Sequence, residues 1–499
     1  MIKRIILLFL ISFSCFSSWA SFSFNENCKK AYERIISLRL DEGQEILKTE
    51  KSVNPSNLIP YYLENYIDFL KVIISEDRTL FNSLKQNKDT RISKMEESEE
   101  ESPYANYCIA EINLQWAFTR MKFKEYITAA SEINKAYKLL KENEKKYPGF
   151  IANLKGLGLL HALIGIIPDD YKWAVNLIGI TGTIKQGVTE LSAVLATALK
   201  NPEYDYLKTE SFFFLTFIQL NLQKNKEEAI KLGKYLESPV YKALVKTNPL
   251  LIYAAANIAI RTGSNDKAIE ILLSRPTGKE YYPFYYLDFL TGASKLNRMD
   301  YDSYKYLYSF LLNFKGQNYI KAAYQKLAWY YLINNNADKY KEKMAYLLTQ
   351  GNTLADEDSQ AQAEAKSNTV PNVRLLKARI LFDGGYYQKA MNLLLEKKPS
   401  EFCVSTKDFL EYTYRLGRIY HEWGFVSKAI SFYESTVKNG SSLTYYFAAN
   451  SALHLGLIYE NLGNKEKAIY YYTLATGMKN TEYKTSINQK AKAGLNRLQ

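Results

Sequence analysis

The sequence predicts an all-α protein, an α-α superhelix in which helical hairpins stack into a solenoid. Apolar residues recur at three- and four-residue steps in almost every segment between turn signals, and convincing alternating strand patterns are absent. Near the end of the chain a small residue, an aromatic, an alanine and a second aromatic recur with a period of 39, since 456 − 417 = 39. A single hairpin cannot bury its apolar face, so neighbouring hairpins must cover it. The repeated positions are Gly417, Tyr420, Ala429 and Tyr433, then Gly456, Tyr459, Ala468 and Tyr472, with Ala378, Leu381, Ala390 and Leu394 one period earlier.

The first twenty residues have the features of an export signal. Lys3 and Arg4 precede an apolar run that starts at Ile5, and Ser18-Trp19-Ala20 supplies the small residues of a cleavage site. The run is shorter than the roughly 20 residues that span a bilayer, so we expect a signal peptide over residues 1–20. The expected location is the periplasm or the outer membrane. A lipid anchor at Cys15 is the alternative.

Cleavage after Ala20 would leave 479 residues (499 − 20), a formal charge of +11 (13 − 2) and three cysteines. An odd number of cysteines cannot form a complete set of disulfides. Two arrangements are open: Cys28 pairs with Cys108 and leaves Cys403 free, or all three are lone buried thiols. The positive charge is spread over lysine-rich helix faces without a long basic run, which argues against nucleic acid as a partner.

Changes in composition divide the remaining chain into regions. Residues 21–103 form an N-terminal helical region that ends in an acidic loop, and residues 104–350 hold degenerate helical repeats. Glycines interrupt the apolar stretch within 156–200, where we expect close packing of helices or sharp turns. Residues 351–371 are either a linker or the extension of a hairpin, and the clear repeats occupy residues 372–499.

Motifs for catalysis are incomplete or missing. Gly156-Leu157-Gly158 lacks the third glycine of a dinucleotide fingerprint and follows no strand, and the segment from Gly179 to Lys185 lacks the ending of a phosphate loop. The three histidines have no metal-ligand spacing, and neither a nucleophile elbow nor a paired-cysteine zinc motif is present. The sequence therefore predicts no enzymatic activity, no metal and no cofactor.

The 39-residue unit resembles the tetratricopeptide repeat (TPR). The resemblance rests on small residues where paired helices touch, on large residues that fill between them, and on the turn from Asn461 to Ala468. The family's unit is near 34 residues, so the surplus would lengthen the turn between repeats. This resemblance implies a scaffold that binds other proteins.

A weaker resemblance extends over the whole chain. It rests on the ending from Ala493 to Leu498 and on a middle region with glycine, proline, tryptophan and further glycines, and it is to the tetratricopeptide repeat protein 39 family. The activities of that family are not expected of an exported chain. The residues of the middle region are Gly165, Pro168, Trp173, Gly179, Gly182 and Gly187.

A second stripe on the first helix of each repeat is expected to face the inner curve of the solenoid. It lies three residues before, one after and four after the small residue. Arg379 and Arg418 would stand one above the other and could hold a carboxylate, unless Asp383 and Glu422 neutralise them. The stripe is Leu375, Arg379 and Phe382, then Tyr414, Arg418 and His421, then Leu453, Leu457 and Glu460.

These observations together predict an exported TPR-type scaffold for protein-protein interaction in the cell envelope. Its expected partner is a protein or peptide, with an acidic segment as the candidate ligand, and peripheral association with a membrane is compatible with this reading. The alternative is a surface-associated helical protein that binds glycan or lipid through some of its 42 tyrosines.

Overall fold

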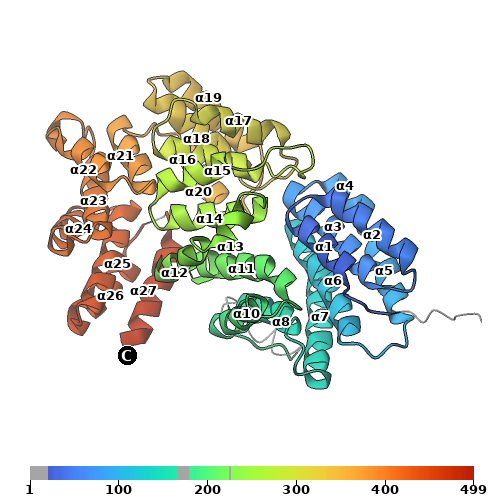
Figure 1. Ribbon diagram of the computed structural model, residues 1–499. Coiled ribbons are helices and arrows are strands. Elements are labelled where there is room, and N and C mark those ends of the chain that lie inside the picture. The colour runs from blue at the N-terminus through green and yellow to red at the C-terminus, as the bar shows by residue number, and fades with distance from the viewer. Residues whose placement is uncertain (1–20, 166–178, 224–225, 481, 499) are drawn as a thin grey trace, which may run out of the picture. The chain divides into compact units, whose positions relative to one another are not determined.

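The computed structural model describes residues 21–165, 179–223, 226–480 and 482–498. The expected signal peptide with Cys15, and also Pro168 and Trp173, lie outside these residues. The described residues form helices joined by turns and loops, and they contain one isolated β-bridge, between Ser21 and Asn57. Consecutive helices pack in adjacent pairs (Figure 1). The prediction of an all-α protein with the architecture of an α-α superhelix is confirmed.

Contacts divide the chain into two compact units. The first comprises the described parts of Met1–Ile73, Thr79–Leu215 and Gly278–Tyr282, and the second those of Ile74–Arg78, Thr216–Thr277 and Pro283–Gln499. The division therefore falls near residue 215, and residues 351–371 lie inside the second unit. Within them α20 (Asp356–Lys366) packs against α18 (Ile320–Ile333) and α19 (Ala337–Thr349).

Helices of the first unit pair in the order of the chain, and α6 and α7 form its longest hairpin. The unit contains α1 (Glu26–Ile36), α2 (Leu40–Val53), most of α3 (Ile59–Ser75), most of α4 (Arg78–Leu84), α5 (Asn87–Glu96), α6 (Pro103–Lys122), α7 (Tyr126–Lys146), α8 (Asn153–Ile164), α10 (Ile184–Ala198), the 3₁₀ turn Asp205–Leu207 and most of α11 (Lys208–Phe217).

A buried network of charges lies inside this unit. Lys155 on α8 exposes 1% of its side chain, and its Nζ lies 2.7 Å from Glu111 Oε2 on α6 and 2.8 Å from Glu210 Oε2 on α11. The hydroxyls of Tyr32 and Tyr66 donate hydrogen bonds to the carboxylate of Glu210. Burial raises the pKa of Glu111, while the nearby Lys155 ammonium opposes that rise. The network joins α1, α3, α6, α8 and α11 through charge-assisted hydrogen bonds.

Glycines bring α8 and α10 close together. A Cβ built on Gly187 of α10 would lie 2.2 Å from the carbonyl oxygen of Gly158 on α8, so neither helix could hold a larger residue here without moving. His161 on the same face of α8 reaches Glu190 of α10, with 2.6 Å between Nδ1 and Oε2. These glycines allow close helix packing, and His161 has a structural partner.

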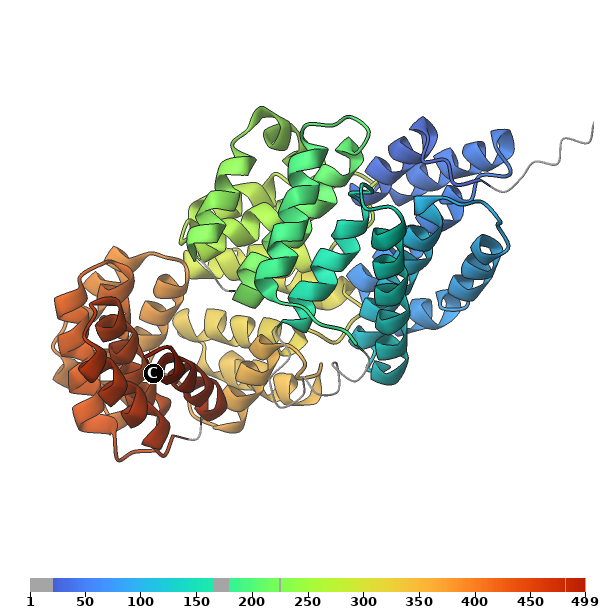
Figure 2. The same cartoon turned by 90° about the horizontal axis from the view of Figure 1, so that it is seen from below.

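The second unit ends in three consecutive hairpins, α21–α22, α23–α24 and α25–α26, which α27 follows (Figure 2). Its helices are α12 (Lys226–Leu236), α13 (Pro239–Val245), α14 (Pro249–Arg261), α15 (Asn265–Leu273), α16 (Tyr286–Asn297), α17 (Ser303–Asn313), α18, α19, α20, α21 (Val373–Asp383), α22 (Tyr387–Leu395), α23 (Thr406–Glu422), α24 (Val426–Gly440), α25 (Tyr446–Asn461), α26 (Lys465–Gly477) and α27 (Lys484–Leu498), with a π-helical turn at Ile218–Gln223 and a 3₁₀ turn at Pro399–Glu401.

One turn geometry recurs in both units, and it marks the repeated module. After the first helix of a hairpin, one residue adopts a left-handed conformation, and the next backbone N–H bonds to the carbonyl five residues before it, as in a Schellman motif. For example, Gly424 has φ 87° and Phe425 N donates to Tyr420 O. The left-handed residues are Leu38, Lys124, Gly263, Met299, Asn335, Gly385, Gly424 and Gly463. The backbone hydrogen bonds, written from the N–H donor to the carbonyl acceptor, are Arg39→Arg34, Glu125→Arg120, Ser264→Ala259, Asp300→Lys295, Asn336→Tyr331, Tyr386→Leu381, Phe425→Tyr420 and Asn464→Tyr459.

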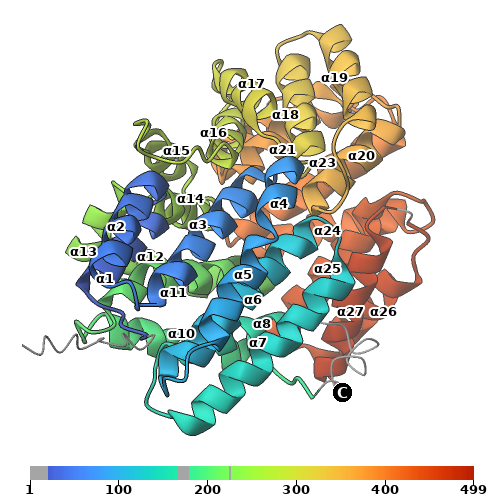
Figure 3. The same ribbon diagram turned by 90° about the vertical axis from the view of Figure 1, so that its right-hand side faces the viewer.

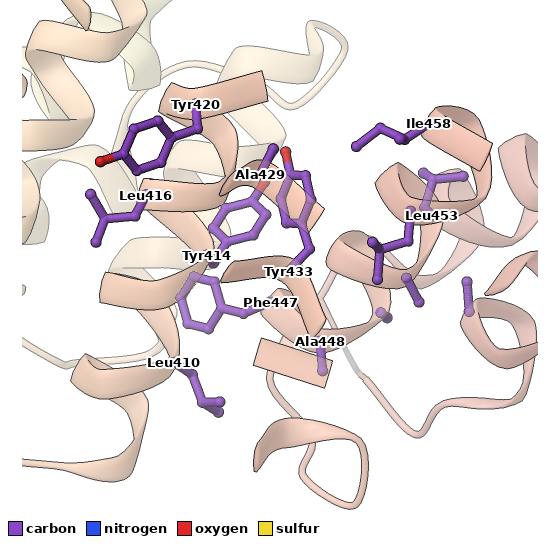
Figure 4. Packing of buried hydrophobic residues seen from close by; sticks show 14 of the residues in the cluster. Leu410, Tyr414, Leu416, Tyr420, Ala429, Tyr433, Phe447, Ala448, Leu453 and Ile458 are labelled. Carbon is purple, nitrogen blue, oxygen red and sulfur yellow. The ribbon is translucent and has the colours of Figure 1, made fainter. Parts of the chain in front are cut away.

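Small residues of the 39-residue period lie against aromatic rings inside their own hairpins. A Cβ on Gly417 would lie 2.6 Å from Tyr433 Cδ1, and a Cβ on Gly456 would lie 2.5 Å from Tyr472 Cδ1. Tyr433 and Tyr472 are fully buried, and Figure 4 shows the Tyr433 ring among the side chains of this core. The alanines of the period, Ala378, Ala390, Ala429 and Ala468, are also fully buried, and Tyr420 and Tyr459 are buried in the same core.

The described cysteines are all free thiols. Cys28 and Cys108 are buried, and Cys403 is half-buried. Among the described helices, none by itself is long and apolar enough to cross a bilayer. The sharply bent pair α13 and α14 meets that test only when its two helices are taken together.

Candidate partner-binding site

A cavity of about 210 Å³ in the second unit brings together four of the six residues proposed from the stripe pattern. Arg379 and Phe382 come from α21, and Tyr414 and Arg418 come from α23. These helices are the first members of consecutive hairpins, which is why the same offsets place their side chains on one face. Gln360, Asp383, Arg415, Tyr446, Asn450 and Tyr483 complete the lining.

Arg418 is the most distinctive group of the cavity. Its guanidinium carbon lies 4.9 Å from the centre of the Phe382 ring, and Nη1 donates to the hydroxyl of Tyr414 at 3.1 Å. Its buried Nε has no hydrogen-bond partner, and no carboxylate of the described residues lies within 4.0 Å of it. A buried donor without a partner is costly, and a ligand oxygen would satisfy it.

The hydroxyl of Tyr414 links Arg418 to the next repeat. It accepts hydrogen bonds from Arg418 and from Asn450 Nδ2 of α25, the latter at 2.7 Å. A tyrosine hydroxyl accepts two hydrogen bonds and donates one, so its own hydrogen remains for a further acceptor. The cavity therefore presents donors from both Tyr414 and Arg418.

Arg379 has a different environment. Its guanidinium carbon lies 4.5 Å from the centre of the Trp329 ring on α18, and Nη1 lies 3.7 Å from Glu364 Oε2 on α20. Trp329 Nε1 donates to the same carboxylate at 2.8 Å. Burial lowers the pKa of Arg379, and the carboxylates of Glu364 and Asp383 more than offset this, so its pKa is raised overall. Arg379 is thus a partly neutralised cation that still exposes 27% of its side chain.

A second cation, the ammonium of Lys326, lies over the same tryptophan ring. Lys326 Nζ lies 4.0 Å from the centre of the Trp329 ring. Burial lowers the pKa of Lys326 to about 8, with Asp383 opposing this shift and Arg379 adding to it. Asp383 and Glu422, considered above as partners for the two arginines, form no ion pair with them within 4.0 Å, and Glu422 instead lies 3.4 Å from Lys226.

Leu375 and His421 do not line the cavity. Leu375 exposes 1% of its surface, because the first turn of α21 belongs to the core where α21 meets α23. His421 is half-buried, with its Nδ1 3.4 Å from the Tyr433 hydroxyl and its ring 5.6 Å from the ring of His454. Burial lowers the pKa of both histidines. The two histidine rings and the Tyr433 ring contact one another and form an aromatic cluster.

Several residues in and around the site were not predicted from the sequence. Tyr446 and Asn450 stand seven and three residues before Leu453, so they extend the stripe by two turns toward the start of α25, and this spacing could have revealed them. Glu364, Trp329 and Lys326 come from α20 and α18, outside the 39-residue period, and no local spacing points to them.

No protein-family model matches the chain, and no curated protein matches it either. Fold and cavity alone therefore define the class of protein. It is an all-helical protein with the architecture of an α-α superhelix, and its second unit carries a cationic, aromatic cavity across consecutive hairpins. Among the described residues, no group of three or more histidine, cysteine, aspartate or glutamate side chains is placed to hold a metal ion.

Proposed function

We propose that this protein is an exported TPR-type scaffold that binds an acidic segment of another protein in the cell envelope. The single observation that carries the proposal is the buried Nε of Arg418, which has no hydrogen-bond partner, on a side chain that lines a cavity together with two further arginines and one aspartate. Anionic oxygens are the strongest acceptors for such a guanidinium. The proposed TPR membership is supported by the recurring turn and by the 39-residue period.

The ion pairs around the cavity favour an anionic ligand over a neutral one. Arg415 pairs with Glu411 and Arg379 lies near Glu364, whereas Arg418 forms no ion pair with Asp383 or with any other carboxylate of the described residues within 4.0 Å. Phe382, Tyr414, Tyr446 and Tyr483 supply flat surfaces on which a peptide chain can pack. The proposed export is supported by the apolar run near the start of the sequence.

A peptide array probed with the full mature chain tests this proposal. Peptides of varied composition should be bound in proportion to their aspartate and glutamate content, and Arg418→Met should remove that preference. Arg34→Met is the matched control, because Arg34 is a surface arginine of the first unit with 47% of its side chain exposed. Equal binding of neutral and acidic peptides would refute the proposal. A glycan array in parallel tests the alternative, which requires binding of a glycan that Tyr414→Ala abolishes.

A further inference from the structure

The first unit contains a second, larger cavity of about 360 Å³ among α5, α6 and α7. These three helices lie side by side (Figure 3). The volume falls within the range of about 300–1,000 Å³ that is typical of small-molecule sites. Polar side chains dominate its lining, including Lys88, Asn113, Arg120, Thr128, Ser131 and Glu132, and Ile92 is the only apolar residue among those that line it.

Glu132 is the key residue of this cavity. It exposes 4% of its surface, and Oε1 accepts hydrogen bonds from Lys88 Nζ at 2.6 Å and from Arg120 Nε at 2.9 Å. Its other oxygen, Oε2, is buried and accepts no hydrogen bond. A buried carboxylate oxygen without a donor is unfavourable, so a ligand that brings a hydrogen-bond donor would stabilise it.

Two cations beside Glu132 retain donors. An ammonium has three N–H groups, and Lys88 uses one of them on Glu132. A guanidinium has five, and Arg120 uses one on Glu132 and one on Glu125. The cavity thus places an unsatisfied acceptor next to positively charged donors. A ligand that carries a cationic donor and an anionic acceptor a few ångströms apart would match both.

We propose that this cavity binds a free α-amino acid, with its ammonium on Glu132 and its carboxylate on Lys88 and Arg120. The hydroxyls of Thr128 and Ser131 would face the remainder of a polar side chain. Among the described residues that line the cavity, none has an aromatic ring on which a sugar could stack, and Ile92 is the only one with an apolar side chain, so a sugar and a lipid are poorer matches. This site lies entirely in the first unit and does not depend on the function proposed for the second.

Isothermal titration calorimetry of the full mature chain with each of the twenty common amino acids tests the proposal. At least one amino acid should bind, and its N-acetyl and amide derivatives should bind about tenfold more weakly or not at all, because each lacks one of the two charges. Glu132→Gln should weaken binding by a similar factor. Binding of N-acetyl derivatives as tight as that of the free amino acid would overturn the assignment.

The Glu132→Gln variant also weakens the ion pairs of Lys88 and Arg120, so it could lose ligand binding through a loss of stability. A variant that fills the cavity separates these two effects. Ser131 is exposed on α7, so Ser131→Trp fills the cavity without touching these ion pairs. Lys138→Trp is its matched control, because Lys138 is exposed two turns further along the same face and does not line the cavity. Ser131→Trp should abolish binding and Lys138→Trp should preserve it. Absence of binding for all twenty amino acids, or binding unchanged by Ser131→Trp, would refute the proposal.

Discussion

The guanidinium of Arg418 stacks on the ring of Phe382, 4.9 Å from its centre, although the two residues belong to different hairpins. Phe382 lies near the end of α21 and Arg418 near the end of α23, so the contact links two consecutive hairpins, and both residues line the cavity. This contact and the Tyr414 hydrogen bond hold the guanidinium while its Nε stays unsatisfied.

Arg418→Lys tests whether the cavity needs a guanidinium or only a charge. A lysine keeps the positive charge, but it loses the flat stacking surface and the forked donors. We expect the affinity for the acidic peptides selected on the array to fall at least about tenfold, with the melting temperature little changed. Fluorescence anisotropy with a labelled peptide measures the first quantity. Affinity equal to that of the unaltered protein would mean that the guanidinium geometry is irrelevant.

The recurring turn gives a paired prediction on stability. Gly424 has φ 87° and its Cβ position is open, so Gly424→Ala would introduce backbone strain without a steric clash and should destabilise the protein by about 1 kcal/mol. Lys124 occupies the equivalent position with φ 66°, so Lys124→Gly should be neutral or stabilising. Thermal unfolding of both variants measures the difference. Stabilisation by Gly424→Ala would contradict the assigned turn.

These turns explain how far the sequence could predict the fold. Helical periodicity established the fold class, and glycines at 385, 424 and 463 accompany the regular period of the last hairpins. Upstream, Gly263 keeps the glycine and Asn335 is a residue that tolerates the left-handed conformation, but Leu38, Lys124 and Met299 hold the position without any sequence signal for a turn. The repeats there could not be counted from the sequence because the geometry persists where its glycine marker is lost.

The candidate site was predictable only where it follows the repeat. Arg379, Phe382, Tyr414 and Arg418 share one face because helical offsets are local geometry. Glu364 reaches Arg379 because α20 packs against α18 between regular hairpins, and such tertiary placement leaves no periodic pattern. The burial of Leu375 likewise depends on the core that α21 shares with α23.

The buried network around Lys155 yields a prediction on stability. Lys155→Met would leave the carboxylates of Glu111 and Glu210 together without a counter-charge and should destabilise the first unit by about 3–5 kcal/mol. Adding Glu111→Gln and Glu210→Gln should recover most of the loss, because the buried charges then disappear together. Urea denaturation of the single and triple variants measures both effects. A single variant as stable as the unaltered protein would contradict the role of the network.

Lys326 makes stability depend on pH in a defined window. Its pKa falls from 10.5 to about 8 on folding, so between these values the unfolded chain binds more protons than the folded one. Stability from this group therefore rises as pH rises from about 8 to 10.5. The Lys326→Met variant should lack this rise, so the melting temperatures of the variant and of the unaltered protein, each plotted against pH, should converge at high pH. Parallel pH profiles for the two proteins would show that Lys326 does not titrate in this range.

Photo-crosslinking in the cell tests the central claim most directly. A benzoylphenylalanine at Gln360, which is exposed and lines the cavity, would react with whatever occupies it, and the same probe at Lys366 on the same helix serves as the control outside the cavity. We predict one dominant envelope protein captured through an acidic segment from Gln360, absent from Lys366 and lost when Arg418→Met is added. The same captured proteins at both positions, or capture that Arg418→Met leaves unchanged, would contradict the assignment of this cavity as the partner-binding site.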